Sequence, residues 1–199
     1  KQADLAMYQA KTAGRSTLRF FDPDMQAAVT QRATLEGELR AAFAKDEFLL
    51  QYQPQSDRSG RVVGVEALVR WRHPTHGLVA PSRFIHSAEE AGIIHEISRW
   101  VLETGCAQMA AWRRQFPELS LSANLSPRDF EHPDLADTVS RVLARHGLPP
   151  ASLELEVSES LLCSDVQHVA PCLKDLRDLG VGISLDDFGT GYSSLASLQ

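Results

Sequence analysis

The segment Leu153–Glu159 reads LELEVSE, and its alternation of side chains is the strongest indicator of the fold class. The two leucines and the valine share one face of the expected strand, whereas the first two glutamates and the serine share the other. One face of this strand is therefore apolar and the other is polar.

Two further segments repeat the pattern. In residues 119–125 apolar side chains alternate with two serines and Asn124, and in residues 61–70 Glu66 and Arg70 share the face opposite three valines and an alanine. Strands of an open doubly wound sheet, which helices cover on both faces, are apolar on both sides. A barrel has helices only on its outer face, so the pattern predicts an α/β fold of the modified (β/α) TIM-type barrel class.

Expected strands and helices alternate from Phe48 onward, which is typical of a parallel α/β fold. We expect strands at residues 48–54, 61–70, 119–125, 152–158 and 181–187. We expect helices at residues 82–91, 95–115, 133–146 and 166–179, and the start of another at residue 193. A barrel of this class needs about 200 to 250 residues, so we expect it to be truncated after about five strands.

Residues 184–195, SLDDFGTGYSSL, bring two adjacent carboxylates out of an apolar strand into a glycine-containing turn. Gly189 and Gly191 permit a sharp turn in which Asp186 and Asp187 converge. Two anions so close repel each other unless a proton or a metal ion lies between them. A solvated strand-to-helix loop is the alternative. The DFG triplet also occurs in protein kinases, but the sequence has neither their glycine-rich phosphate loop nor their His-Arg-Asp loop.

Four oxygen donors are predicted to point inward near the carboxyl ends of four different strands: Glu66, Asn124, Glu156 and Asp186. With Asp187 beside them, they could surround one or two divalent ions. Carboxylate and amide oxygens without thiolate or imidazole favour Mg²⁺ or Mn²⁺. Each residue also has a structural interpretation, since Asn124 could cap the following turn and Glu156 could be a salt-bridged residue at the rim.

Arg70 and the first strand offer further polar groups. Arg70 lies on the Glu66 face, where its guanidinium could bind a phosphate oxygen or pair with a neighbouring carboxylate. Gln53 and Gln55 could supply amide contacts to a base or a phosphate, although Pro54 between them could simply end the strand.

The composition is that of a globular domain and argues against several functions. The chain has 199 residues, 43% of them hydrophobic, with a net charge of −6. This acidic balance argues against a surface that coats DNA or RNA. The three cysteines form no C-x-x-C pair, which argues against a zinc site. No segment approaches the roughly 20 apolar residues of a membrane span and no secretion signal is visible, so we expect a cytoplasmic location.

The motifs around these residues resemble those of EAL-domain phosphodiesterases, which hydrolyse cyclic di-GMP. They occur in the family's order and at matching spacing: YQPQ at 52–55, EALVRW at 66–71, HP at 73–74, NLS at 124–126, ELEVSES at 154–160 and DDFGTGYSSL at 186–195. The resemblance covers roughly residues 40 to 199. His86-Ser87 stand where the family often has Ile/Val-Pro, and Ser158 replaces a common Thr, but neither departure affects an expected ligand.

The resemblance implies a metal-dependent phosphodiesterase that uses two divalent ions, Mg²⁺ or Mn²⁺, and releases linear pGpG. One ion would be bound by the four donors above. The second would be held with the help of Asp187, and Glu159 would steady the loop after it. The implied catalytic residues are therefore Glu66, Glu159, Asp186 and Asp187. The residues implied to contact the dinucleotide are Gln53, Leu68 and Arg70.

Residues 3–22 resemble the last helix and strand of a GGDEF diguanylate cyclase domain, with Ser16 in place of the usual Asn. We therefore expect a GGDEF-like tail at residues 1–22, a connector helix at residues 23–45, and an EAL-like domain at residues 46–199, incomplete at its C-terminus. We expect the full protein to be a bacterial signalling homodimer, which segments outside this chain could anchor to a membrane. The family also uses a later Lys and Glu, so a catalytically inactive cyclic di-GMP receptor is the alternative.

Overall fold

The computed structural model describes residues 23–158 and 166–186, and the side chains of residues 34–158 and 169–186. The chain divides into two compact units between Lys45 and Asp46. The described part of the first unit is the helix α2 (Pro23–Ala44). The predicted GGDEF-like tail lies outside the described residues.

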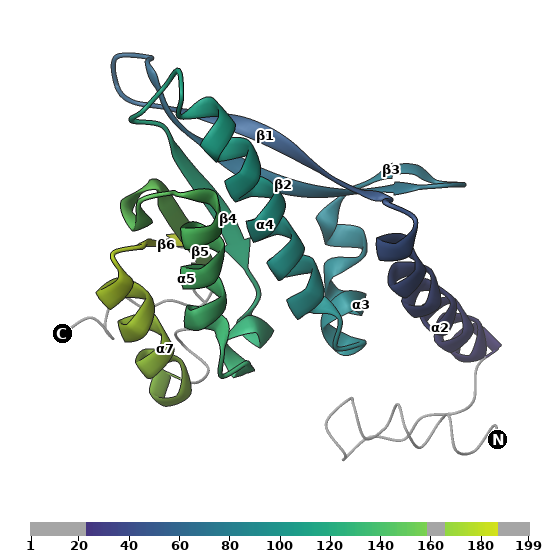
Figure 1. The fold of residues 1–199 in the computed structure, drawn as a ribbon. Helices are drawn as coiled ribbons and strands as arrows, with labels where there is room; N and C mark the ends of the chain where they lie inside the picture. Colours follow the sequence, from purple (N-terminus) through teal and green to yellow (C-terminus); the bar gives the residue numbers. More distant parts are fainter. Residues whose placement is uncertain (1–22, 159–165, 187–199) are drawn as a thin grey trace. The chain divides into compact units, whose positions relative to one another are not determined.

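The second unit is built on a six-stranded sheet (Figure 1). Its strands are β1 (Phe48–Ser56), β2 (Val62–His73), β3 (Gly77–Val79), β4 (Ser120–Leu125), β5 (Leu153–Ser158) and β6 (Gly182–Asp186). The order is β1-β2-β4-β5-β6, with β3 paired to the far end of β2. The strands β2, β4, β5 and β6 are parallel, as the α/β pattern predicts.

The first two strands form an antiparallel hairpin, unlike the parallel repeat expected from Phe48 onward. Residues 57–61 connect them, and a connection this short cannot make the crossover that a parallel pair requires. Asp57 stabilises the turn, since its carboxylate accepts hydrogen bonds from Ser59 N at 2.8 Å and Arg61 N at 3.1 Å. The short strand β3, which was not expected, is also antiparallel to β2.

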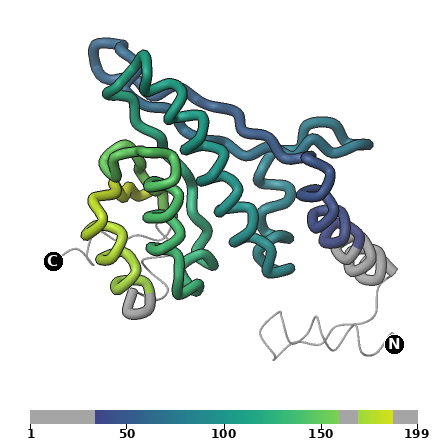
Figure 2. Tube along the Cα trace, in the orientation of Figure 1, coloured from purple at the N-terminus to yellow at the C-terminus, as the bar shows by residue number. Residues whose placement is uncertain are grey.

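Helices pack on the apolar face of the sheet. They are α3 (Ile85–Glu90), α4 (Ile94–Trp112), α5 (Leu135–His146) and α7 (Val166–Leu179), and the 3-10 turns are η1 (Pro81–Arg83), η2 (Pro127–Glu131) and η3 (Pro150–Ser152). The helix α4 packs against β4, β1 and β2, and α5 lies between α4 and α7 (Figure 2). The strand residues of this face are buried, among them Val65, Ala67, Leu121, Ala123, Leu155 and Val157.

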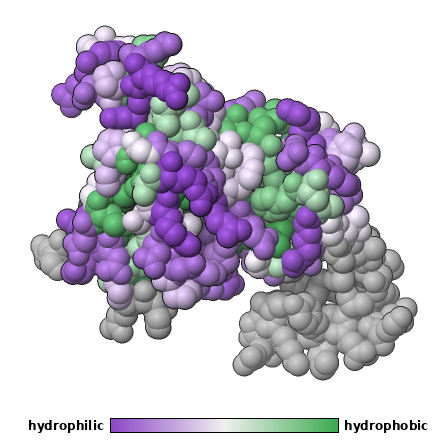
Figure 3. All heavy atoms as spheres, viewed as in Figure 1, coloured by the Kyte–Doolittle hydropathy of each residue, from purple (hydrophilic) through white to green (hydrophobic). Residues whose placement is uncertain are grey.

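The helix α4 approaches β4 closely because residue 105 is glycine. A Cβ atom at Gly105 would lie 3.0 Å from Leu121 Cδ2, which is tighter than normal van der Waals contact. The buried residues of α4 recur at intervals of three and four, as in a helix with one apolar face. Its outward side and that of α5 are mainly hydrophilic (Figure 3).

The pairing of β2 changes along its length. It pairs with β4 from Gly64–Ser120 to Ala67–Ala123, and beyond Ala67 it pairs with β1 and β3. Within the described ranges, no helix combines the length and the apolar character needed to cross a lipid bilayer.

Candidate functional site

The face of the sheet opposite the helices carries polar side chains from five strands. The register pairs them across neighbouring strands: Gln53 with Glu66, Glu66 with Ser122, Asn124 with Glu156, and Ser158 with Asp186. Residues paired in this way, and residues two apart on one strand, lie on the same face. The four predicted oxygen donors therefore share one face, which we call the polar face.

These donors gather toward the carboxyl-terminal edge of the parallel strands. Asn124 is the next-to-last residue of β4, and Asp186 is the last of β6. Glu66 precedes the last parallel pair of β2. Asn124 Nδ2 donates a hydrogen bond to Glu66 Oε1 at 2.8 Å, which joins β2 and β4 through side chains.

Gln55 links β1 to the same group. Ser122 Oγ donates to its Oε1 at 3.3 Å, and its Nε2 donates to Glu156 Oε1 at 3.4 Å. A Cβ atom at residue 64 would lie only 2.8 Å from Gln55 Oε1, so Gly64 leaves the space that this amide needs. Gln55 therefore contacts the polar face directly, through Ser122 and Glu156.

Electrostatic repulsion is concentrated at Glu156. Burial raises its pKa to about 7, and the negative charges of Glu66, Asp186 and Glu154 also raise it. Nearby, Ser184 Oγ is buried and has no hydrogen-bond partner among the described residues. A bound cation would neutralise the repulsion among these acidic residues. A water molecule bound to the cation could form the hydrogen bond that Ser184 Oγ lacks.

A cavity of about 650 Å³ lies at this edge, and residues from both faces of the sheet and from the helices α3 and α4 line it. Glu66, Leu68, Asn124 and Asp186 are among the residues that line it. A cavity of this volume is within the range of small-molecule binding sites. Gln53 and Arg70 do not line it, although both belong to the neighbouring hairpin.

Arg70 is held by neutral oxygens. Its Nε donates to Gln51 Oε1 at 2.8 Å, and its Nη1 donates to the carbonyl oxygen of Val69 at 2.9 Å. Val69 lines the cavity, and Gln51 pairs with Leu68, which also lines it. The guanidinium thus stays next to the cavity without forming part of its wall.

The helices contribute residues to this cavity that the sequence pattern did not predict. Glu89 of α3 and Ser98 of α4 line it together with Ser126, the capping residue before η2. Ser126 Oγ donates to Glu89 Oε1 at 2.6 Å. The run Ser126-Pro127-Arg128-Asp129 is a recognisable capping-box pattern and could have marked this turn.

The described residues supply only part of the predicted donor set. Among them, no three His, Cys, Asp or Glu side chains lie close enough together to hold a metal ion. The predicted residues Glu159 and Asp187 lie outside the described ranges. The described part of the site is thus Glu66, Asn124, Glu156 and Asp186 on one face, three of them lining one cavity.

A parallel α/β sheet with acidic residues at the carboxyl ends of its strands is typical of barrel proteins whose sites lie at that end. The EAL domain family matches residues 36–199, and the chain belongs to this family. Solved EAL domains have the same fold, so the modified TIM-type barrel class is confirmed.

Relatives and solved structures agree on the family. The chain is 43% identical over 199 residues to the bifunctional diguanylate cyclase/cyclic di-GMP phosphodiesterase MucR of Pseudomonas aeruginosa, covering 99% of the chain and 29% of MucR. It is 42% identical over 201 residues to the cyclic di-GMP phosphodiesterase NbdA of the same organism, covering 100% of the chain and 26% of NbdA. The chain thus spans little more than a quarter of the length of these relatives.

Among solved structures, the MucR phosphodiesterase in complex with c-di-GMP superimposes with a TM-score of 0.78 at 44% identity, covering 83% of this chain and 68% of that one. The EAL enzyme Bd1971 bound to cAMP and cyclic di-GMP superimposes with a TM-score of 0.81 at 29% identity, covering 98% and 52%.

Proposed function

We propose that this chain is part of a domain that hydrolyses cyclic di-GMP to linear pGpG with Mg²⁺ or Mn²⁺. The observation that carries the proposal is the polar face, where Glu66, Asn124 and Glu156 come from three adjacent strands. Family membership and the named activities of MucR and NbdA support it.

Glu66, Asn124, Glu156 and Asp186 would hold one ion, and Asp187 would help to hold a second. The donor set fits such an ion in its chemistry, because its oxygens are hard ligands and because the charges around Glu156 repel one another. The three carboxylates would have to move closer together to hold it, since among the described residues no three acidic side chains are near enough. Bound ions of this kind supply an activated water and neutralise the charge of the scissile phosphate.

The protein's own residues would orient the reaction. The bond from Asn124 Nδ2 to Glu66 Oε1 leaves the second carboxylate oxygen of Glu66 and the amide oxygen of Asn124 for further contacts. Leu68 would contact the dinucleotide from the cavity wall, and Gln53 and Arg70 would contact it from the hairpin. Glu159 would steady the loop after Asp187.

Product analysis tests the proposal. The full-length protein is incubated with cyclic di-GMP and Mn²⁺ or Mg²⁺, and pGpG is separated by chromatography, with Glu66→Ala as the comparison. We expect pGpG from the wild type and none from the variant. Binding of cyclic di-GMP without release of pGpG would identify a receptor instead.

We also propose a cytoplasmic location and a homodimeric full-length protein. Cell fractionation and light scattering of the purified protein test these two points, and a monomer at working concentration would contradict the second.

A further inference from the structure

Asp129 lies outside the predicted donor set, yet it holds the end of the strand that carries Asn124. It belongs to η2, which follows β4 directly, and it is only 2% exposed. Its Oδ2 accepts hydrogen bonds from Ser126 N at 2.9 Å and from Ser98 Oγ at 2.7 Å. A buried carboxylate held by several donors is a rigid anchor.

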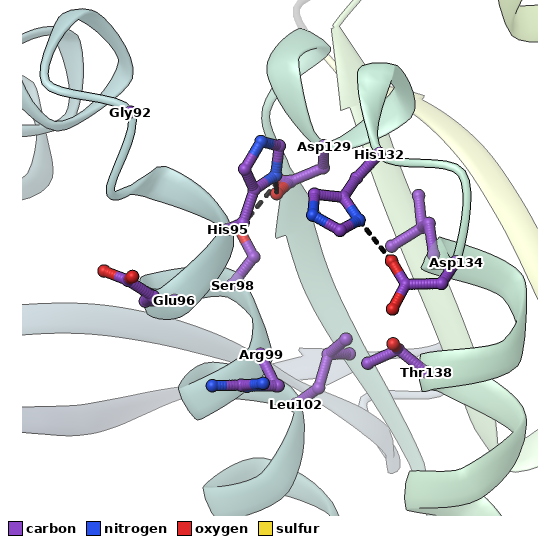
Figure 4. A pocket seen from close by; sticks show the side chains of 11 residues that line it. Gly92, His95, Glu96, Ser98, Arg99, Leu102, Asp129, His132, Asp134 and Thr138 are labelled. Carbon is purple, nitrogen blue, oxygen red and sulfur yellow. Dashed lines mark hydrogen bonds and ion pairs between the residues drawn. The ribbon is translucent and has the colours of Figure 1, made fainter.

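The partners of Asp129 join β4 to α4. His95 Nδ1 lies 3.1 Å from Asp129 Oδ1, within hydrogen-bond distance. Figure 4 shows the side chains of His95 and Ser98, both from α4, beside that of Asp129. All three residues line a cavity of about 290 Å³. Asp129 lines this second cavity, and its partner Ser98 lines both this cavity and the one at the candidate site.

Ser126 is held from a second side by α3. Its Oγ donates to Glu89 Oε1 at 2.6 Å and accepts a hydrogen bond from Arg128 N at 3.1 Å. Its backbone N–H is the group bound by Asp129. The residue two positions after Asn124 is thus fixed by both helices that border the candidate site.

We propose that Asp129 is a positioning residue for the metal site. Through the N–H of Ser126 it fixes the end of β4, so that Asn124 keeps its place between Glu66 and Glu156. This inference rests on the proposed function, since it needs a divalent ion at the polar face. Asp129 itself touches neither the ion nor the substrate. Groups that orient a metal ligand in this way typically contribute about 10- to 100-fold to metal affinity.

The first test measures Mn²⁺ binding to the full-length protein by isothermal titration calorimetry. We expect Asp129→Ala to weaken Mn²⁺ binding about 10-fold or more. We expect the Mn²⁺ affinity of Asp129→Asn to stay close to that of the wild type. The amide oxygen of Asn can accept hydrogen bonds from Ser126 N and Ser98 Oγ, and its NH₂ group can donate to His95 Nδ1 when His95 carries its proton on Nε2. Equal losses in both variants, or no loss in either, would overturn the proposal.

A double-mutant cycle tests whether Asp129 acts through Asn124. In an Asn124→Ala background, we expect Asp129→Ala to cause no further loss of Mn²⁺ affinity. Losses that multiply would show that the two residues act independently and would overturn the proposal. Val139→Ala, at a fully buried position of α5, controls for destabilisation of the helix layer, and we expect its Mn²⁺ affinity to be unchanged.

Glu66→Ala separates this inference from the function on which it rests. If Glu66→Ala binds Mn²⁺ as the wild type does, no metal site exists at the polar face and both fail. If Glu66→Ala loses binding while Asp129→Ala does not, the proposed function stands and the positioning role of Asp129 falls.

Discussion

Asp129 is a buried carboxylate and Glu156 a partly buried one, and their surroundings act in opposite directions. Burial raises the pKa of each. At Asp129 the neighbours Ser98, Ser126 and His95 counteract that rise by hydrogen bonding. At Glu156 the neighbouring charges of Glu66, Asp186 and Glu154 add to it.

These different surroundings indicate that Asp129 is a structural carboxylate and that Glu156 is one that could bind a cation. The protein itself supplies the donors that Asp129 needs, so this residue is complete within the fold. Glu156 lies in a group of like charges, so a counterion from solution would stabilise it. The predictions below test this comparison, from the largest expected effect to the smallest.

Asp186→Asn should lower turnover of cyclic di-GMP by about 100-fold or more while changing stability little, because it removes a ligand charge and keeps the side-chain volume. Turnover is measured as pGpG release, and stability by urea unfolding. Asp178→Asn, an exposed residue of α7 that pairs with Lys174, is the matched control and should stay near wild type. Full turnover in Asp186→Asn would remove Asp186 from the site.

Leu155→Ala should destabilise the protein by about 2–5 kcal/mol, because Leu155 is fully buried beneath the helices. Glu154→Ala, the adjacent residue on the opposite face of β5, should change stability by less than about 1 kcal/mol. Urea unfolding measures both. Similar losses in the two variants would contradict the division of the sheet into an apolar and a polar face.

Mn²⁺ at about 100 times its dissociation constant should stabilise the wild type by about 2.7 kcal/mol. Glu156→Gln should lose most of this gain, whereas Glu154→Gln should keep it, since Glu154 is not an expected ligand. Thermal unfolding with Mn²⁺ and with a chelator makes the comparison. An equal gain in all three proteins would place the ion elsewhere.

The pH dependence of stability should have opposite signs at Asp129 and Asp134. Because burial raises the pKa of Asp129 above 3.8 in the folded state, its contribution is present at low pH and is lost as the pH rises through the raised pKa. The hydrogen bond from His132 lowers the pKa of Asp134, so its contribution is lost as the pH falls. Urea unfolding of Asp129→Asn and Asp134→Asn against the wild type, from pH 3 to 7, measures both slopes. Slopes of the same sign would refute the assignment.

The strand pattern predicted much of this fold because alternation reports burial directly. The segment Leu153–Ser158 is a strand with the expected buried and polar faces. The alternation of strands and helices did not predict the antiparallel hairpin, because it does not take the lengths of the connections into account. Residues 57–61 are too few for the crossover that joins parallel strands. Strand β3 has three residues, too few for a recognisable period.

The candidate site was only partly visible in the sequence, for a related reason. Oxygen donors on strands, such as Glu66 and Asn124, can be predicted from the sequence because successive side chains of a strand point to opposite faces of the sheet. Glu89 and Ser98 reach the cavity from α3 and α4, and helix periodicity does not reveal which end of a barrel a helical side chain approaches. The roles of Glu159 and Asp187 remain predictions.

The strands β2 and β4 stop pairing after Ala67, and the residues that follow on both strands line the cavity. Ala67, Leu68 and Val69 lie on one side of the gap, and Asn124, Leu125 and Ser126 lie on the other. The ends of two neighbouring strands thus border the cavity. A change of ligand preference would therefore come more readily from substitutions on α3 and α4 than from any reshaping of these strand ends.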